Sequence, residues 1–239
     1  MDSIISGLKV KLFADGADLP GMLEMATKPF ISGFTTNPTL MRKAGINDYA
    51  TFAKSVLKEI KDKPISFEVF SDDVEEMKIQ GEKIASWGEN VFVKIPITNA
   101  RGESTLSTIK HLNEQNVKLN VTALMTVEQV KEVAGALNSE NPSFVSVFAG
   151  RIADTGRDPV PIMTECLKIL SDTASTELIW ASPRELLNII QADEIGCQII
   201  TATNDILSKL PLLGKDLSDY SLETVQMFER DARLSNFKI

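Results

Sequence analysis

The chain has 239 residues, a formal net charge of −8 and an apolar fraction of 43%. The acidic balance argues against a nucleic-acid-binding protein, which would usually present a basic surface. Chains of about 200–250 residues often form one α/β barrel domain, so we expect a single domain over residues 1–239.

Eight runs rich in apolar and β-branched residues are predicted to form strands. In chain order they are 10–15, 33–37, 65–70, 91–96, 118–124, 144–150, 177–182 and 198–203. Helical patterns lie between them, and the predicted helix starts are Asn47, Ser71 or Asp72, Thr126, and Asp158 with Pro159. Strands that alternate with helices predict a (β/α)8 barrel, also called a TIM barrel.

Two helical segments follow the last strand. The first, at about 204–213, is expected to complete the ring of helices. The second, at about 217–234, is an extra C-terminal helix with no place in the ring. We expect it either to cover one end of the barrel or to reach a neighbouring subunit, which favours a homo-oligomer.

The strands carry two kinds of residue in alternation, and successive side chains of a strand point to opposite faces. One parity is aliphatic, as in Val91, Val93 and Ile95, and is expected to pack on the helices. The other parity is expected to face the barrel interior and mixes aromatic residues with Asp15, Asn37, Glu68, Lys94, Asn120, Thr122, Ser146 and Ser182. Most of these polar residues lie near the C-terminal ends of their strands, where barrels of this type carry their chemistry.

Lys94 stands within the apolar run VFVKIPIT. Burying an isolated ammonium is costly, and such a group usually loses its proton and becomes a nucleophile. A neutral lysine adds to a ketone or aldehyde and forms a Schiff base, and nearby carboxyl groups such as Asp15 and Glu68 then transfer the protons. The alternative is that Lys94 has a structural role and forms a salt bridge with Asp15 or Glu68.

Other features of the sequence limit the cofactors and the location. Cys166 and Cys197 have no metal-type spacing, and His111 is the single histidine, so no metal site is predicted. The N-terminus does not resemble a signal peptide, and no apolar run approaches the ~20 residues of a membrane helix. We therefore expect a cytoplasmic protein without a membrane segment or a disulfide framework.

Several segments resemble the transaldolase family. In order they are KLFADGAD, GFTTNPTLM, FEVF, VFVKIPIT, LNVTALMT, SVFAGRIAD and WASPREL. They are most similar to the short transaldolase-like group that includes bacterial fructose-6-phosphate aldolases, and the resemblance covers nearly the whole chain. It implies a metal-free class I enzyme of carbohydrate metabolism and the pentose phosphate pathway, which transfers a three-carbon dihydroxyacetone unit between sugar phosphates without a cofactor.

The resemblance also implies roles for individual residues. The Schiff-base lysine of the family corresponds to Lys94, the acid that handles the hydroxyl proton to Asp15, and the carboxylate that positions the catalytic water to Glu68. The expected substrate-binding residues are Thr35, Asn37, Asn120, Thr122, Ser146, Phe148, Arg151, Ser182 and Arg184. Glu68 and Phe148 favour a transaldolase, because the related aldolases carry Gln and Tyr at these positions.

The run after the seventh strand departs from the family pattern, which usually ends in Ala-Ser-Phe-Arg. This chain has Ala181-Ser182-Pro183-Arg184. In one alternative, Arg184 joins Arg151 at the substrate phosphate. In the other, Pro183 opens the next helix, Arg184 turns outward to a surface carboxylate, and Arg151 is left alone at the phosphate. Two other functions stay open: an aldolase that releases the three-carbon unit, and a catalytically silent barrel that binds a sugar phosphate.

Overall fold

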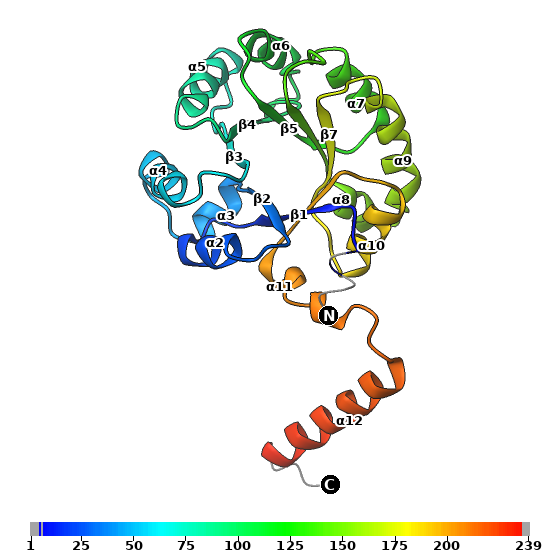
Figure 1. The fold of residues 1–239 in the computed structure, drawn as a ribbon. Helices are drawn as coiled ribbons and strands as arrows, with labels where there is room; N and C mark the ends of the chain where they lie inside the picture. The colour runs from blue at the N-terminus through cyan, green and yellow to red at the C-terminus, as the bar shows by residue number, and fades with distance from the viewer. Residues whose placement is uncertain (1–4, 6, 236–239) are drawn as a thin grey trace.

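A closed barrel of eight parallel strands forms the centre of the computed structural model, which describes residue 5 and residues 7–235 (Figure 1). The strands follow one another around the barrel in chain order, and β8 closes on β1. Their bounds are β1 Lys11–Asp15, β2 Ile31–Thr35, β3 Ile65–Glu68, β4 Val91–Pro96, β5 Leu119–Leu124, β6 Ser143–Val147, β7 Thr176–Trp180 and β8 Ile199–Ala202. The predicted (β/α)8 fold is confirmed.

Several strands end earlier than predicted, and this moves some of the site residues onto loops and helix ends. The expected strand 33–37 is β2, which ends at Thr35, so that Asn37 caps the next helix instead. The expected strand 144–150 ends at Val147 because a helix begins at Ala149. Apolar runs that continue beyond a strand give no periodicity signal for its last residue.

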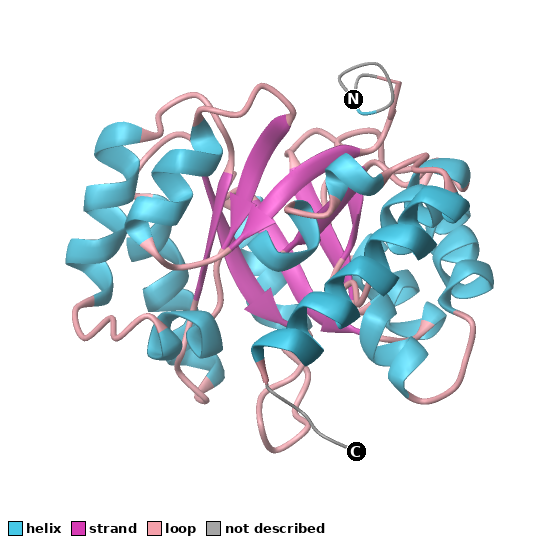
Figure 2. Cartoon of the chain, turned by 90° about the horizontal axis from the view of Figure 1, so that it is seen from below, coloured by secondary structure: helices cyan, strands magenta, loops and turns pink. Residues whose placement is uncertain are grey.

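Helices surround the barrel (Figure 2). Their bounds are α2 Leu19–Ala26, α3 Pro38–Lys43, α4 Tyr49–Glu59, α5 Val74–Ala85, α6 Leu106–Glu114, α7 Val127–Ala134, α8 Ala149–Asp154, α9 Pro159–Leu170, α10 Leu187–Glu194, α11 Asn204–Leu207, the 3-10 helix η1 Leu210–Leu212, and α12 Leu217–Leu234. The segment expected to form one helix at about 204–213 is thus α11 followed by η1, which contains Pro211. Proline cannot continue an α-helical hydrogen-bond ladder.

Short polar side chains cap several of the helix starts, among them those of α4, α5, α7 and α9. Thr126 and Asp158 cap α7 and α9, as predicted. The other predicted starts are wrong by one or two residues: Asp48 caps α4 in place of Asn47, and Asp73 caps α5 in place of Ser71 or Asp72. Neighbouring Asn, Ser and Asp residues have similar capping preference, so the sequence alone does not choose among them.

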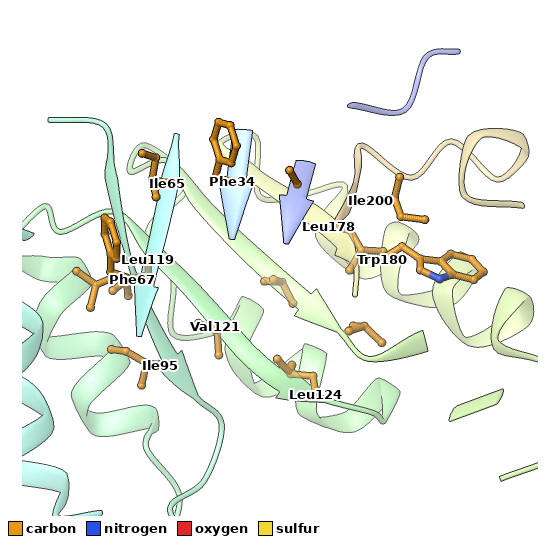
Figure 3. Packing of buried hydrophobic residues seen from close by; sticks show 14 of the residues in the cluster. Phe34, Ile65, Phe67, Ile95, Leu119, Val121, Leu124, Leu178, Trp180 and Ile200 are labelled. Carbon is orange, nitrogen blue, oxygen red and sulfur yellow. The ribbon is translucent and has the colours of Figure 1, made fainter. Parts of the chain in front are cut away.

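Two apolar layers confirm the predicted alternation of the strand side chains. The outer layer lies between strands and helices, and Figure 3 shows part of it, including Phe67, Ile95 and Trp180. The inner layer fills the barrel below its mouth and consists of Phe13, Phe92, Phe144, Ile179, Ala181 and Ile199. A Cβ atom at Gly33 would lie 2.5 Å from the ring of Phe13, so glycine makes room for this ring inside the barrel.

The C-terminal helix α12 lies outside the ring of helices (Figure 1). None of its residues is buried, and the exposed apolar ones are Leu217, Tyr220, Leu222, Val225, Met227, Phe228 and Leu234. The expectation that it covers one end of its own barrel is therefore wrong, and the neighbouring-subunit alternative stays a prediction. Within the described part of the chain, α12 and the other helices are too short or too polar to cross a bilayer.

Candidate active site

The C-terminal mouth of the barrel opens into a cavity of about 710 Å³. All predicted site residues but one line it, namely Asp15, Thr35, Asn37, Glu68, Lys94, Thr122, Ser146, Phe148, Arg151, Ser182 and Arg184. The exception is Asn120, which is fully buried. Among the described residues, no cluster of three His, Cys, Asp or Glu side chains is placed to hold a metal ion.

Lys94 lines this cavity with a side chain that is only 7% exposed. The strands β3 and β4 pair Glu68 with Lys94, which brings Nζ to 3.2 Å from Oε2 of Glu68. Nζ also donates a hydrogen bond to the backbone carbonyl of Thr36 at 3.1 Å. The salt bridge alone suits a structural lysine, but a structural pair needs no open cavity in front of it, whereas a nucleophile does.

Asp15 lies at the end of β1 and lines the same cavity. Its Oδ1 accepts a hydrogen bond of 2.7 Å from the hydroxyl of Thr35. Burial raises the pKa of Asp15 above its ordinary value, while the positive charge of Lys94 and the hydrogen bond from Thr35 oppose the rise. A carboxyl group with a raised pKa takes up and releases protons closer to neutral pH, as an acid–base catalyst must.

Asn120 is held away from the cavity by two hydrogen bonds. Its side-chain nitrogen donates to the hydroxyl of Ser66 at 2.9 Å, and its oxygen accepts from the hydroxyl of Ser146 at 2.7 Å. The prediction that Asn120 faces the interior is confirmed, but its amide connects β3, β5 and β6 beneath the site. We therefore expect it to position Ser146 rather than to contact a ligand directly.

Thr122 lies on β5 just before its pairing with β6 becomes irregular, and its side-chain hydroxyl differs from the other polar groups of the site in its hydrogen bonding. Its Oγ1 is buried and has no hydrogen-bond partner among the described residues. The next residue, Ala123, has a φ of 64°, and the pairing of β5 with β6 is irregular between Val121 and Leu124. Buried hydroxyl groups are nearly always hydrogen-bonded, so this one, on the cavity wall, is suited to a water molecule or a ligand.

Asn37 combines a structural contact with a place on the cavity wall. Its side-chain oxygen accepts a hydrogen bond of 2.9 Å from the backbone N–H of Leu40 and so caps α3. The amide nitrogen is the part of the side chain that this cap leaves available. Asn37 therefore offers a donor to a ligand oxygen.

Arg184 lines the cavity, but it is bound to a carboxylate. Its Nε donates to Oδ1 of Asp154 at 2.9 Å, and Nη2 donates to Oδ2 of the same residue. Nη1 donates to the hydroxyl of Ser182 at 2.9 Å. Arg184 thus contacts a surface carboxylate, as in the second alternative of the sequence analysis. The helix on which that alternative depended is not formed at Pro183.

The alternative with a helix start at Pro183 is wrong in its helix, because α10 begins at Leu187. Ser182 has a φ of 60°, and the backbone N–H of Arg184 donates to Oδ1 of Asn188 at 2.7 Å. A Cβ atom at Gly150 would lie 1.5 Å from the backbone oxygen of Ser182. Gly150 therefore allows the start of α8 to approach this turn and to carry Arg151 into the cavity wall.

Sequence reasoning missed several residues of the cavity wall, among them Lys43, Met125, Thr201, Thr203 and Asp205. Thr201 had a signal, because it shares the inward parity of Ile199 in the last predicted strand. Thr203 has the same parity in that predicted strand, whereas Lys43, Met125 and Asp205 lie on helices or turns that no strand parity describes. Tyr49 was also missed: its hydroxyl donates to the backbone oxygen of Glu68 at 2.9 Å and thereby supports the end of β3.

Comparisons with known proteins identify a matching family model and several relatives of this chain. A family model described as transaldolase/fructose-6-phosphate aldolase matches residues 12–238. A probable transaldolase of Thermoanaerobacter sp. (strain X514) is 33% identical over 96% of this chain and 100% of its own length. Similar probable transaldolases occur in Dehalococcoides mccartyi, with 33% identity over 84% of this chain and 90% of that protein, and in Methanococcus maripaludis (strain C7), with 32% identity over 90% and 94%.

Proposed function

The chain belongs to the transaldolase/fructose-6-phosphate aldolase family, and from this premise we propose that it is a Schiff-base transaldolase whose nucleophile is Lys94. The observation that carries the proposal is a buried lysine that opens onto a 710 Å³ cavity. The carboxyl groups of Asp15 and Glu68 line the same cavity, and Glu68 lies 3.2 Å from Nζ. The substrates are sugar phosphates, and no metal or cofactor takes part.

In the first step, the neutral amine of Lys94 attacks the carbonyl carbon of a ketose phosphate, and a carbinolamine forms. Glu68 holds the water that leaves in this step and that later returns to hydrolyse the imine. The unpartnered Oγ1 of Thr122 is a second polar group for this water. Glu68, 3.2 Å from Nζ, takes the ammonium proton of Lys94 before the attack and returns it to the hydroxyl that leaves. Loss of water then gives a protonated imine, which acts as an electron sink.

In the second step, the carboxylate of Asp15 takes the proton from the hydroxyl group on the carbon β to the imine carbon. The bond between the α and β carbons then breaks, its electron pair moves into the imine system, and an aldehyde leaves. A three-carbon enamine stays on Lys94. The reverse sequence on an acceptor aldehyde forms the new bond, and Asp15 returns its proton to the alkoxide.

Phosphate recognition is assigned to Arg151 and Arg184, with Ser182 beside them. Arginine makes paired, charge-assisted hydrogen bonds to phosphate. The guanidinium carbon of Arg151 lies 5.4 Å from the ring centroid of Phe148, and this contact holds it at the cavity wall. Arg184 uses the part of its guanidinium group that Asp154 leaves accessible.

We further propose that the protein assembles into a homo-oligomer through α12 and acts in the cytoplasm, in the pentose phosphate pathway. A helix of 18 residues with no buried residue leaves its apolar side chains in water, which is unfavourable by the hydrophobic effect. A second copy of the chain can cover them. Light scattering of the full chain and of a Val225→Asp/Phe228→Asp variant tests this assembly.

Borohydride trapping tests the chemical mechanism. Incubation with a ketose phosphate and borohydride is expected to add a sugar-derived mass to the peptide that contains Lys94. Lys94→Met is expected to abolish both the labelling and turnover. The matched control is Lys118→Met, which removes a lysine bound to the backbone oxygen of Glu89, and it is expected to keep both.

Two outcomes would contradict the mechanism: labelling of another lysine, or full activity of the Lys94→Met variant. Absence of any trapped adduct in the native protein would favour the catalytically silent barrel. A trapped adduct together with release of free dihydroxyacetone, in the presence of an acceptor aldehyde, would favour the aldolase.

A further inference from the structure

The hydroxyl groups of Thr35 and Thr201 form a short chain that ends on Asp15. The Oγ1 atom of Thr35 lies 2.7 Å from Oδ1 of Asp15 and 2.5 Å from Oγ1 of Thr201. The strand β1 pairs with β2 on one side and with β8 on the other, so the three residues meet inside the barrel. Thr35 is 2% exposed and Thr201 is 5% exposed.

On the basis of the proposed function, we propose that Thr201 is a positioning residue that allows Asp15 to alternate between its ionised and protonated forms without leaving a hydroxyl group unsatisfied. The hydroxyl groups of Thr35 and Thr201 hold two protons between them, whichever form Asp15 takes. Each threonine hydroxyl has one proton to donate and can accept from a neighbour. The order of donors along the chain can therefore run in either direction.

When Asp15 is ionised, Thr35 donates to the carboxylate and Thr201 donates to Thr35. When Asp15 carries the substrate proton on Oδ1, its new O–H donates to Thr35, and Thr35 turns its own proton toward Thr201. Thr201 lines the cavity and turns its proton toward the ligand or water that the cavity holds. Either oxygen of the threonine pair can be the donor at the observed distance. Both hydroxyls rotate, no proton is gained or lost by the chain, and every oxygen keeps its position.

Without the Thr201 hydroxyl, the hydrogen bonds around Asp15 suit its ionised form better than its protonated form. The ionised form keeps its hydrogen bond from Thr35. In the protonated form, the proton of Thr35 loses its acceptor, and a buried donor without an acceptor is costly. Removal of the Thr201 hydroxyl therefore disfavours protonated Asp15 and lowers the pKa of Asp15.

Other charged groups around the cavity stay unchanged in this comparison. Lys94 on β4 acts directly on Asp15 through its charge. The remaining charged groups on the cavity wall are Glu68 of β3, Lys43 of α3, Arg151 of α8, Arg184 after β7 and Asp205 of α11. Thr201→Val keeps the shape of the side chain and changes none of these charges. A change in the pKa of Asp15 in this variant is therefore due to loss of the Thr201 hydroxyl.

The test is a carbon-13 NMR titration of the Asp15 carboxyl group, assigned with Asp15→Asn. We expect Thr201→Val to lower the pKa by about one unit, the smaller shift compatible with an unmet buried donor, and Thr201→Ser to restore it. The kcat of Thr201→Val should fall by a factor of about three to ten with KM unchanged, since proton transfer follows Brønsted behaviour. The control is Thr108→Val, which removes a buried hydroxyl bound to the backbone of Val74.

An unchanged or raised Asp15 pKa in Thr201→Val would overturn the proposal, and so would an equal shift in Thr108→Val. The titration does not depend on turnover. If the native protein yields no borohydride adduct, the proposed function fails, and the NMR shift still decides whether Thr201 serves both forms of Asp15.

Discussion

Replacement of Arg184 by alanine tests how this site recognises phosphate. We expect Arg184→Ala to lower kcat/KM for a phosphorylated ketose donor and to leave an unphosphorylated analogue almost unaffected. Hydrogen bonds to charged groups contribute about 1.5–3 kcal/mol. The lower limit applies to Arg184, because its side chain is 46% exposed and is shared with Asp154. At ~1.4 kcal/mol per decade, the expected loss is about tenfold.

Replacement of Asp154 tests whether this carboxylate competes with phosphate for Arg184. Its carboxylate holds Nε and Nη2 of Arg184, and it repels a phosphate that approaches them. Asp154→Asn is therefore expected to raise kcat/KM for the phosphorylated donor by a factor of about two to five, because exposed ion pairs are weak. The double variant Asp154→Asn/Arg184→Ala should show the same low kcat/KM for the phosphorylated donor as Arg184→Ala alone.

The assay is steady-state turnover with matched phosphorylated and unphosphorylated donors at constant ionic strength. Arg157→Ala is the control, since Arg157 contacts the hydroxyl of Thr155 outside the set of residues that lines the cavity. Equal losses on both donors with Arg184→Ala, or no loss on either, would refute the reasoning. Lower activity of Asp154→Asn on the phosphorylated donor would show that Asp154 orients Arg184 for phosphate rather than competing with it.

Two further predictions follow from the cavity and its rim. Glu68→Gln with Phe148→Tyr is expected to raise the ratio of aldol cleavage to transfer, measured with and without an acceptor aldehyde; an unchanged or lower ratio would show that these positions do not set the partition. Gly150→Ala is expected to destabilise the fold by at least ~1–3 kcal/mol in thermal unfolding, the usual range for overpacking, because its Cβ would lie 1.5 Å from the backbone oxygen of Ser182. Gly135→Ala is the control, where the nearest atom is 3.6 Å away, and an equal stability of both variants would contradict the reasoning.

Strand parity carried most of the information about the fold and the site. Alternation along a strand is a consequence of local backbone geometry, so it placed Asp15, Glu68 and Lys94 on one face before any contact was known. The C-terminal ends of parallel strands meet at one mouth, and the cavity there contains these three residues. The extra helix was also predictable, and α12 covers Leu217–Leu234 as expected.

The sequence did not determine where strands end or which polar groups meet. Asn37 lies within the predicted strand 33–37, but Asn before Pro38 is also a helix-start signal, and the folded chain shows that Asn37 caps α3. Asn120 has the inward parity of a site residue, yet its two hydrogen bonds to Ser66 and Ser146 hold it below the cavity. Parity defines the face of a strand, but it does not define the depth at which a side chain finds its partners.

Long-range contacts were decided by the tertiary structure alone. Thr201 reaches Thr35 across 166 positions of the chain, because closure of the barrel places β8 and β2 on either side of β1. Arg184 binds Asp154 across 30 positions of the chain, and the turn that carries Arg184 has a left-handed φ of 60° at Ser182, a conformation that serine rarely adopts. Covalent geometry makes the alternation of a strand local, whereas the partner of a hydroxyl or a charge depends on the path of every loop between them.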